Sequence, residues 1–242
     1  MTSLSEERER LLRRLHSAAG TLPLGAFFLL HLWINARVSR GHAAYDAVTA
    51  QFQRVPALFA IELLVVFAPL TFHAAAGVFL MAKGAKREAR GAGDKPWATV
   101  MQRLTGALTL GFLVVHLFQF RLQVATDQIR PADFFPLLCD RLSATNGLGI
   151  PSSAVIYLAG LAAASYHFAN GILGSCFTFG FVRSGPSARL VSACCAGVGL
   201  ATFLVGANTV ISLSTGAPWP GRGEPPTRED VGVIRIGQRT PN

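Results

Sequence analysis

Five long segments that are almost free of charge constrain this chain more than any other feature. They lie at about residues 16–36, 57–83, 101–121, 151–182 and 190–213. Each approaches or exceeds the roughly 20 apolar residues that an α-helix needs to cross a hydrocarbon layer of about 30 Å. Charged residues make up only 14% of the chain, whereas soluble domains carry about 25%. We therefore predict an all-α integral membrane protein with five transmembrane helices. A soluble enzyme, a nucleic-acid-binding protein and a disordered chain are poor interpretations.

The basic residues between these segments predict the orientation in the membrane. The net charge is +9, from 22 Lys and Arg against 13 Asp and Glu. Lys and Arg accumulate on the cytoplasmic side of membrane proteins. With the N-terminus in the cytoplasm, that side receives twelve basic residues and the short outer loops receive six. We therefore expect residues 1–15 to form a cytoplasmic amphipathic segment and residues 215–242 to form a flexible tail outside.

Four histidines lie deep in the first four segments, one in each. His31 and His116 each lie 15 residues from the cytoplasmic start of their segment, and His73 and His167 each lie 16 residues from the outer start. At 1.5 Å per residue, these depths are about 22 Å from the inner edge and about 24 Å from the outer edge. In a layer of about 30 Å the histidines therefore form two level pairs, about 15 Å apart.

Two level pairs of histidines are what two bis-histidine haems in a four-helix bundle require. Each haem iron needs two axial nitrogens at one depth on facing helices. We therefore predict that His31 and His116 bind one haem iron and that His73 and His167 bind another, in a bundle of the first four helices. A single zinc site is disfavoured because the pairs are too far apart. A transporter or proton channel with a histidine relay remains an alternative, and such a protein would be colourless.

Small and polar residues near the histidines are candidates to contact the haems. Gly77 and Gly171 follow histidines of their own helices by four residues. Because that spacing places them on the ligand's helix face, we expect them to pack against the porphyrins. Carboxylates near a membrane edge need cationic or hydroxyl donors. The candidates to bind haem propionates at the cytoplasmic ends of the helices are Arg14, His16, Ser17 and Arg103. Anchoring at the membrane edge is the alternative role for the arginines.

Glu62 is the one formal charge within the second segment. A charge in that position costs at least about 2.5 kcal/mol unless it is compensated. It precedes His73 by 11 residues, about three helical turns, so both lie on nearly the same face. Glu62 is therefore a candidate proton carrier for a quinone near the outer surface. A structural ion pair with an outer-loop arginine such as Arg54 is the alternative. Asp46, in the first outer loop, is a second candidate proton carrier, and His42 in the same loop is expected to be solvated.

Four sequence stretches resemble a known family. They are RRLHSAAGTLPLGAFFLLHLWIN, AIELLVVFAPLTFHAAAGVF, QRLTGALTLGFLVVHLFQFR and SYHFANGI. These stretches resemble the cytochrome b membrane anchor of succinate dehydrogenase and fumarate reductase, in its single-chain, five-helix, di-haem form. The resemblance runs from about Arg13 to the end of the fourth segment and more loosely through the fifth.

The resemblance implies how such a chain works. His73 and His167 would bind the proximal haem b, nearer the cytoplasm. His31 and His116 would bind the distal haem b. A flavoprotein subunit with covalent FAD and an iron–sulfur subunit would sit on the cytoplasmic face of a bacterial inner membrane, in a complex for which a dimer is one option. The anchor would not oxidise succinate itself, but would carry electrons to a quinone, often menaquinone. Ser165 stands where some fumarate reductases carry a glutamate, which favours succinate oxidation.

Another respiratory complex is the main alternative. A di-haem quinol-oxidising subunit of a hydrogenase or formate dehydrogenase would usually bind its partner on the outer face. Here the basic residues of the N-terminus and of residues 83–95 offer a docking surface on the cytoplasmic side. This distribution favours the succinate dehydrogenase anchor.

Overall fold

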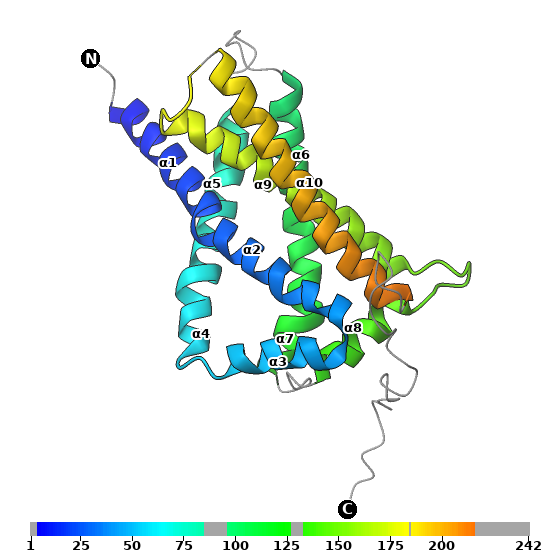
Figure 1. Ribbon diagram of the computed structural model, residues 1–242. Helices are drawn as coiled ribbons and strands as arrows, with labels where there is room; N and C mark the ends of the chain where they lie inside the picture. Colours follow the sequence, from blue (N-terminus) through cyan, green and yellow to red (C-terminus); the bar gives the residue numbers. More distant parts are fainter. Residues whose placement is uncertain (1–3, 85–95, 127–132, 184, 216–242) are drawn as a thin grey trace, which may run out of the picture.

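The computed structural model describes residues 4–84, 96–126, 133–183 and 185–215. Within these ranges every regular element is a helix, and five helical stretches are long and apolar enough to cross a membrane (Figure 1). The predicted all-α fold with five transmembrane helices is confirmed. The expected C-terminal tail lies outside the described residues, apart from its first residue, and so does most of the basic loop at residues 83–95.

The first span consists of two helices, α1 (Leu4–Thr21) and α2 (Pro23–Asn35). They separate at Pro23, which has no N–H to donate and whose ring excludes a carbonyl of the preceding turn. Sequence analysis expected a separate N-terminal segment before residue 16. Helix α1 continues without a break from Leu4 through His16, so residues 4–15 and the start of the span form one helix, and the cytoplasmic place of residues 1–15 stays a prediction.

The second and third spans each contain a π-helical turn. The second span runs through α4 (Leu58–Ile61), the π turn η2 (Glu62–Phe67) and α5 (Ala68–Gly84). The third runs through α6 (Pro96–His116), the π turn η4 (Leu117–Arg121) and α7 (Leu122–Ala125). A π turn is rare within an α-helix and occurs frequently at functional sites.

The fourth and fifth spans, α9 (Ser152–Thr178) and α10 (Pro186–Thr215), pack side by side (Figure 1). Glycines let these helices approach closely, as is common in membranes. A Cβ atom on Gly199 would lie 2.9 Å from the Cβ of Ala169, and one on Gly206 would lie 2.6 Å from Leu161. The fifth span therefore lies against the fourth, and it also contacts α2 of the first span.

Two short helices cross one end of the bundle, α3 (His42–Gln53) and α8 (Phe134–Ser143) (Figure 1). Their apolar faces join the spans in a buried cluster. Its largest members are Tyr45, Phe120, Phe135, Leu137, Leu138, Leu142 and Tyr157. We call this end the capped end and the end where α1 begins the N-terminal end. His42, expected to be solvated, is 33% exposed, and one face of its ring stacks on Phe135 at 4.4 Å.

Candidate functional site

The structure brings the four span histidines together in two pairs. The ring centroids of His73 and His167 are 6.1 Å apart and those rings are nearly perpendicular. The centroids of His31 and His116 are 5.7 Å apart, with a similar angle. Imidazole nitrogens bind first-row metals at about 2 Å, so two rings that share one metal have centroids about 6 Å apart. In both pairs, the distance between the ring centroids is therefore that expected for two imidazoles bound to one metal ion.

The pair nearer the N-terminal end presents the nitrogens that metal binding needs. Nδ1–H of His73 donates to the carbonyl of His16 at 2.9 Å, and Nδ1–H of His167 donates to the carbonyl of Gln102 at 3.1 Å. A carbonyl only accepts hydrogen bonds, so each ring carries its proton on Nδ1 and keeps the lone pair on Nε2. Histidines that bind metals are oriented by this kind of outer hydrogen bond. The residues therefore fit a haem iron held between two Nε2 atoms.

The two residues that accept these hydrogen bonds also donate a side-chain hydrogen bond to the backbone carbonyl of the same histidine. Nδ1–H of His16 donates to the carbonyl of His73 at 3.0 Å, and the two rings stack at 4.0 Å. We call this reciprocal contact between His16 and His73 the first bracket. In the second bracket, between Gln102 and His167, the Gln102 amide donates to the carbonyl of His167 at 3.2 Å. Asn170 in turn donates to the Gln102 side-chain oxygen at 2.9 Å.

The pair nearer the capped end has a different outer partner. Nδ1–H of His116 donates to the Tyr157 hydroxyl at 3.3 Å, and that hydroxyl donates to the Gln119 side-chain oxygen at 2.7 Å. The ring of Phe112 lies 5.8 Å from His116 and that of Phe120 lies 5.5 Å from it. The Nε2 atom of His116 therefore also keeps its lone pair available to bind a metal, and the side chains around the ring are mainly aromatic.

Gly77 and Gly171 face the bracket side chains. A Cβ atom on Gly77 would lie 3.1 Å from the ring of His16, and one on Gly171 would lie 3.7 Å from the amide nitrogen of Gln102. Sequence analysis expected both glycines to pack against porphyrins. The structure places Gly77 tightly against His16 and Gly171 in ordinary contact with Gln102, and packing against a porphyrin stays a prediction.

Two other glycines lie against the histidines of the N-terminal pair. A Cβ atom on Gly20 would collide with the ring of His73, and one on Gly106 would lie 2.8 Å from the ring of His167. Gly111, one and a half turns further along α6, faces open space. The absence of a side chain at Gly20 and Gly106 is therefore what lets the two rings sit where they do.

The candidates for propionate binding are only partly free for that role. The Ser17 hydroxyl is 2.6 Å from that of Ser175, which is also 2.6 Å from Thr21. The Nδ1 atom of His16 is used in the first bracket. Arg14 is exposed on α1 and Arg103 is partly buried on α6, directly after Gln102. Arg14, His16 and Ser17 lie in the second half of α1, and Arg103 lies in the first half of α6.

Glu62 forms an ion pair with Arg121. The Nη2 atom of Arg121 lies 2.7 Å from the Glu62 carboxylate and its Nε atom lies 3.2 Å from the same oxygen. The structural partner is therefore one of the arginines assigned to the outer loops, Arg121 and not Arg54. Asp46 is engaged elsewhere, because its carboxylate lies 3.0 Å from the ring of His42 on α3.

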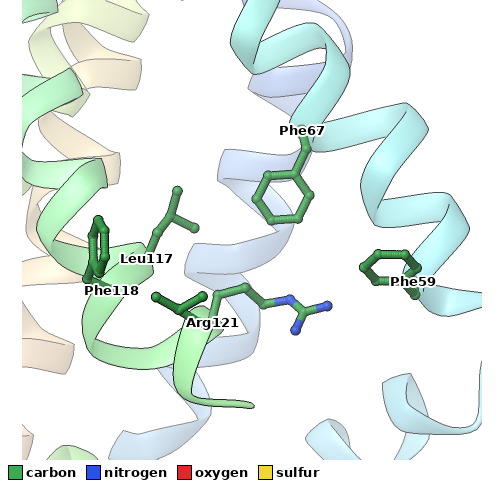
Figure 2. A pocket seen from close by; sticks show the side chains of 6 residues that line it. Phe59, Phe67, Leu117, Phe118 and Arg121 are labelled. Carbon is green, nitrogen blue, oxygen red and sulfur yellow. The ribbon is translucent and has the colours of Figure 1, made fainter. Parts of the chain in front are cut away.

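A pocket of about 340 Å³ lies beside this ion pair. Its walls come from the second and third spans, and Arg121 extends from the third span toward Phe59 of the second (Figure 2). The lining residues are Phe59, Phe67, Leu117, Phe118, Arg121 and Leu122. Because Phe59 is 65% exposed and Phe118 is 62% exposed, the pocket opens on the apolar flank of the bundle. It offers one cationic hydrogen-bond donor in an otherwise apolar wall.

Sequence reasoning missed the roles of Gln102, Tyr157 and Arg121. Arg121 was counted among the outer-loop arginines, but it was not singled out as the partner of Glu62, although its place near the outer edge matched that of Glu62. The signal for Gln102 and Tyr157 was a polar side chain within an apolar span, where hydrogen-bond partners come from neighbouring helices.

The chain is similar to a protein of known name. It is 29% identical to the succinate dehydrogenase cytochrome b558 subunit of Bacillus subtilis (strain 168) over 187 residues, which are 77% of this chain and 88% of that protein. No protein-family model matches the chain. No solved structure matches it. The match confirms the family resemblance that the histidine-containing stretches indicated.

Proposed function

We propose that this homologue of a succinate dehydrogenase cytochrome b subunit is the membrane anchor of a succinate:quinone oxidoreductase. The observation that carries the proposal is the pairing of four span histidines at 5.7 and 6.1 Å, within a chain of five apolar helices. The partners are a flavoprotein subunit with FAD and an iron–sulfur subunit. They bind on the cytoplasmic face, where the N-terminus of the chain lies.

The histidine pairs hold two haems b. His73 and His167 bind the iron of the proximal haem, and His31 and His116 bind that of the distal haem. When bound, the haems supply one-electron transfer between the iron–sulfur subunit and a quinone. The protein fixes the orientation of the proximal imidazoles through two backbone carbonyls, and that of His116 through the Tyr157 hydroxyl. The aromatic and aliphatic surroundings of the capped end exclude water from the distal site.

The pocket between the second and third spans is the candidate quinone site. Its apolar walls suit the ring and tail of a quinone such as menaquinone, which enters from the lipid through the exposed flank. Arg121 donates a hydrogen bond to a quinone carbonyl. Reduction of a quinone to a quinol takes up two electrons and two protons, and Glu62 is the carboxylate positioned to pass protons to the ring oxygens. Asp46 is the second candidate for that step.

Succinate oxidation is the proposed direction. Ser165, at the position where some fumarate reductases carry a glutamate, is buried and holds no carboxylate that could move a proton beside His167. The only proton carriers proposed for this chain therefore lie at Glu62 and Asp46.

A reduced-minus-oxidised spectrum and a pyridine haemochrome assay of the purified protein test the proposal. We expect two b-type haems per chain. Protein made with ample haem that remains colourless would refute the proposal and favour a histidine relay for protons or ions. A soluble partner that co-purifies on the outer face would instead favour the subunit of a hydrogenase or formate dehydrogenase.

A further inference from the structure

The first two spans and the next two are built from the same sequence pattern. HSAAGTLPLGAFFLLH, which begins at His16, corresponds to QRLTGALTLGFLVVH, which begins at Gln102, with one residue fewer. Both stretches have glycine at the fifth and tenth positions and end on a span histidine. HAAAGV, beginning at His73, likewise corresponds to HFANGI, beginning at His167. The chain therefore contains an internal repeat in which Gln102 takes the place of His16.

The structure uses the repeat in both brackets. Each bracket residue presents its backbone carbonyl to Nδ1–H of the paired histidine and donates a side-chain N–H to the carbonyl of that histidine. The glycine four residues after the bracket residue makes room for the histidine ring. The glycine four residues after the histidine lies beside the bracket side chain: a Cβ atom on Gly77 would be tight against His16 at 3.1 Å, and one on Gly171 would be in ordinary contact with Gln102 at 3.7 Å. Both helix pairs therefore share the reciprocal hydrogen bonds and the glycine that makes room for the histidine ring.

One difference between the repeats has a physical explanation. The His16 ring is held by stacking on His73, at 4.0 Å and 9° between the planes. A glutamine amide is not held by ring stacking, and Asn170 fixes it through a hydrogen bond of 2.9 Å. The position equivalent to Asn170 in the first repeat is Ala76. A histidine at the bracket position therefore occurs with alanine at residue 76, whereas a glutamine there occurs with asparagine at residue 170.

We propose that Gln102 is the counterpart of His16, a positioning residue that fixes the imidazole of His167 as His16 fixes that of His73. Its side chain sets the height of α6 against α9, which keeps the Gln102 carbonyl in line with Nδ1–H of His167. Hydrogen bonds of this type to ligand histidines tune metal affinity and ligand basicity. The inference rests on the proposed function, because it assigns Gln102 to the proximal haem.

The inference predicts that the two brackets are interchangeable. The double variant Gln102→His with Asn170→Ala rebuilds the second bracket in the form of the first, and Gly171 leaves room for the new ring. Gln102→Leu removes the side-chain hydrogen bonds with nothing in their place. Gln123→Leu is the control, because Gln123 lies on α7 and accepts a hydrogen bond from Arg141, away from the second bracket.

The variants are compared in the assembled complex by haem content, by the low-spin haem signals in electron paramagnetic resonance, and by redox titration of the two haems. For Gln102→Leu we expect the signal and midpoint potential of one haem to shift, with haem content falling from two toward about one per chain. The double variant should restore both haems and a signal near that of the parent. The control should match the parent in all three measurements.

Three outcomes would overturn the inference. If Gln102→Leu leaves both signals and both potentials unchanged, the side chain does not position the ligand. If the double variant loses the haem as Gln102→Leu does, the two brackets are not equivalent. If Gln102→Leu fails to assemble, the double variant still decides the matter, because it must assemble with two haems. A parent protein without haem would refute the proposed function as well, whereas the first two outcomes leave that function intact.

Discussion

Arg121 and Glu62 join two π-helical turns on neighbouring spans. Glu62 is the first residue of η2, Arg121 is the last residue of η4, and their side chains meet at 2.7 Å. Both side chains are about 30% exposed, at 29% for Glu62 and 30% for Arg121. The ion pair thus compensates a carboxylate in an apolar helix, and its Arg121 partner also lines the adjacent pocket.

Replacing the Glu62 carboxylate tests its role in proton transfer. In Glu62→Gln we expect quinone reduction by the complex to fall about 100-fold or more, which is the usual contribution of a positioned acid or base. Haem content and succinate-dependent reduction of a soluble dye should stay unchanged, because both depend on other parts of the complex. Arg54→Gln is the control, and it should keep full quinone reductase activity. Normal quinone reduction in Glu62→Gln would shift the role to Asp46 or to water.

Removing a proximal histidine should remove one haem before the other. In His73→Ala or His167→Ala we expect the haem nearer the N-terminal end to be lost and the distal haem to be partly retained, because His31 and His116 form a separate pair. The pyridine haemochrome assay should give about one haem per chain. His42→Ala, which changes a histidine of α3 outside the pairs, should retain both haems. Equal loss of both haems from every single histidine variant would contradict the assignment of pairs.

Gly20 and Gly106 offer a sharp steric test. A methyl group at either position would enter the space of a proximal histidine ring, whereas one at Gly111 would meet nothing within 4 Å. In Gly20→Ala or Gly106→Ala the ring must therefore move from its bracket, and we expect proximal haem content to fall by half or more. Gly197→Ala, on the fifth span and also with nothing within 4 Å of the added methyl group, should keep both haems. The measurement is haem content per chain together with the α-band of the reduced spectrum, and wild-type values in all three variants would reject the steric argument.

The Cys139 thiol should be unreactive at neutral pH. Burial in the cluster at the capped end raises its pKa to about 11, and only the thiolate reacts with maleimides. In a variant that keeps Cys139 but has Ser at positions 176, 194 and 195, we expect the labelling rate in detergent to rise about tenfold for each pH unit between pH 7 and pH 10. Labelling should become fast after unfolding in dodecyl sulfate. A rate that levels off near pH 9 would show that the thiol is not buried as described.

Much of the candidate site followed from the sequence. The level of each histidine depends on the rise per residue of a helix and on the thickness of a bilayer, which hardly vary between proteins. Counting residues was therefore enough to expect that His31 would meet His116 and that His73 would meet His167. That these pairs bind haem stays a prediction.

Counting residues could not predict the brackets, the partner of Glu62 or the neighbours of the glycines. They depend on how far each helix rotates about its axis and slides along its neighbour, and a small rotation turns a side chain from one neighbouring helix to another. Pro23 also breaks the first span, and two π turns shift the faces of the second and third. A uniform helix of 3.6 residues per turn does not reproduce those faces.

The sequence by itself determined five membrane helices, one histidine in each of the first four and the depth of each histidine, because these properties arise within single helices. The tertiary structure alone decided that His16 and Gln102 contact His73 and His167 and that Arg121 neutralises Glu62. These contacts join residues 57 to 65 positions apart. They form only when packing fixes the rotation and register of whole helices against one another, and no local pattern of residues encodes that arrangement.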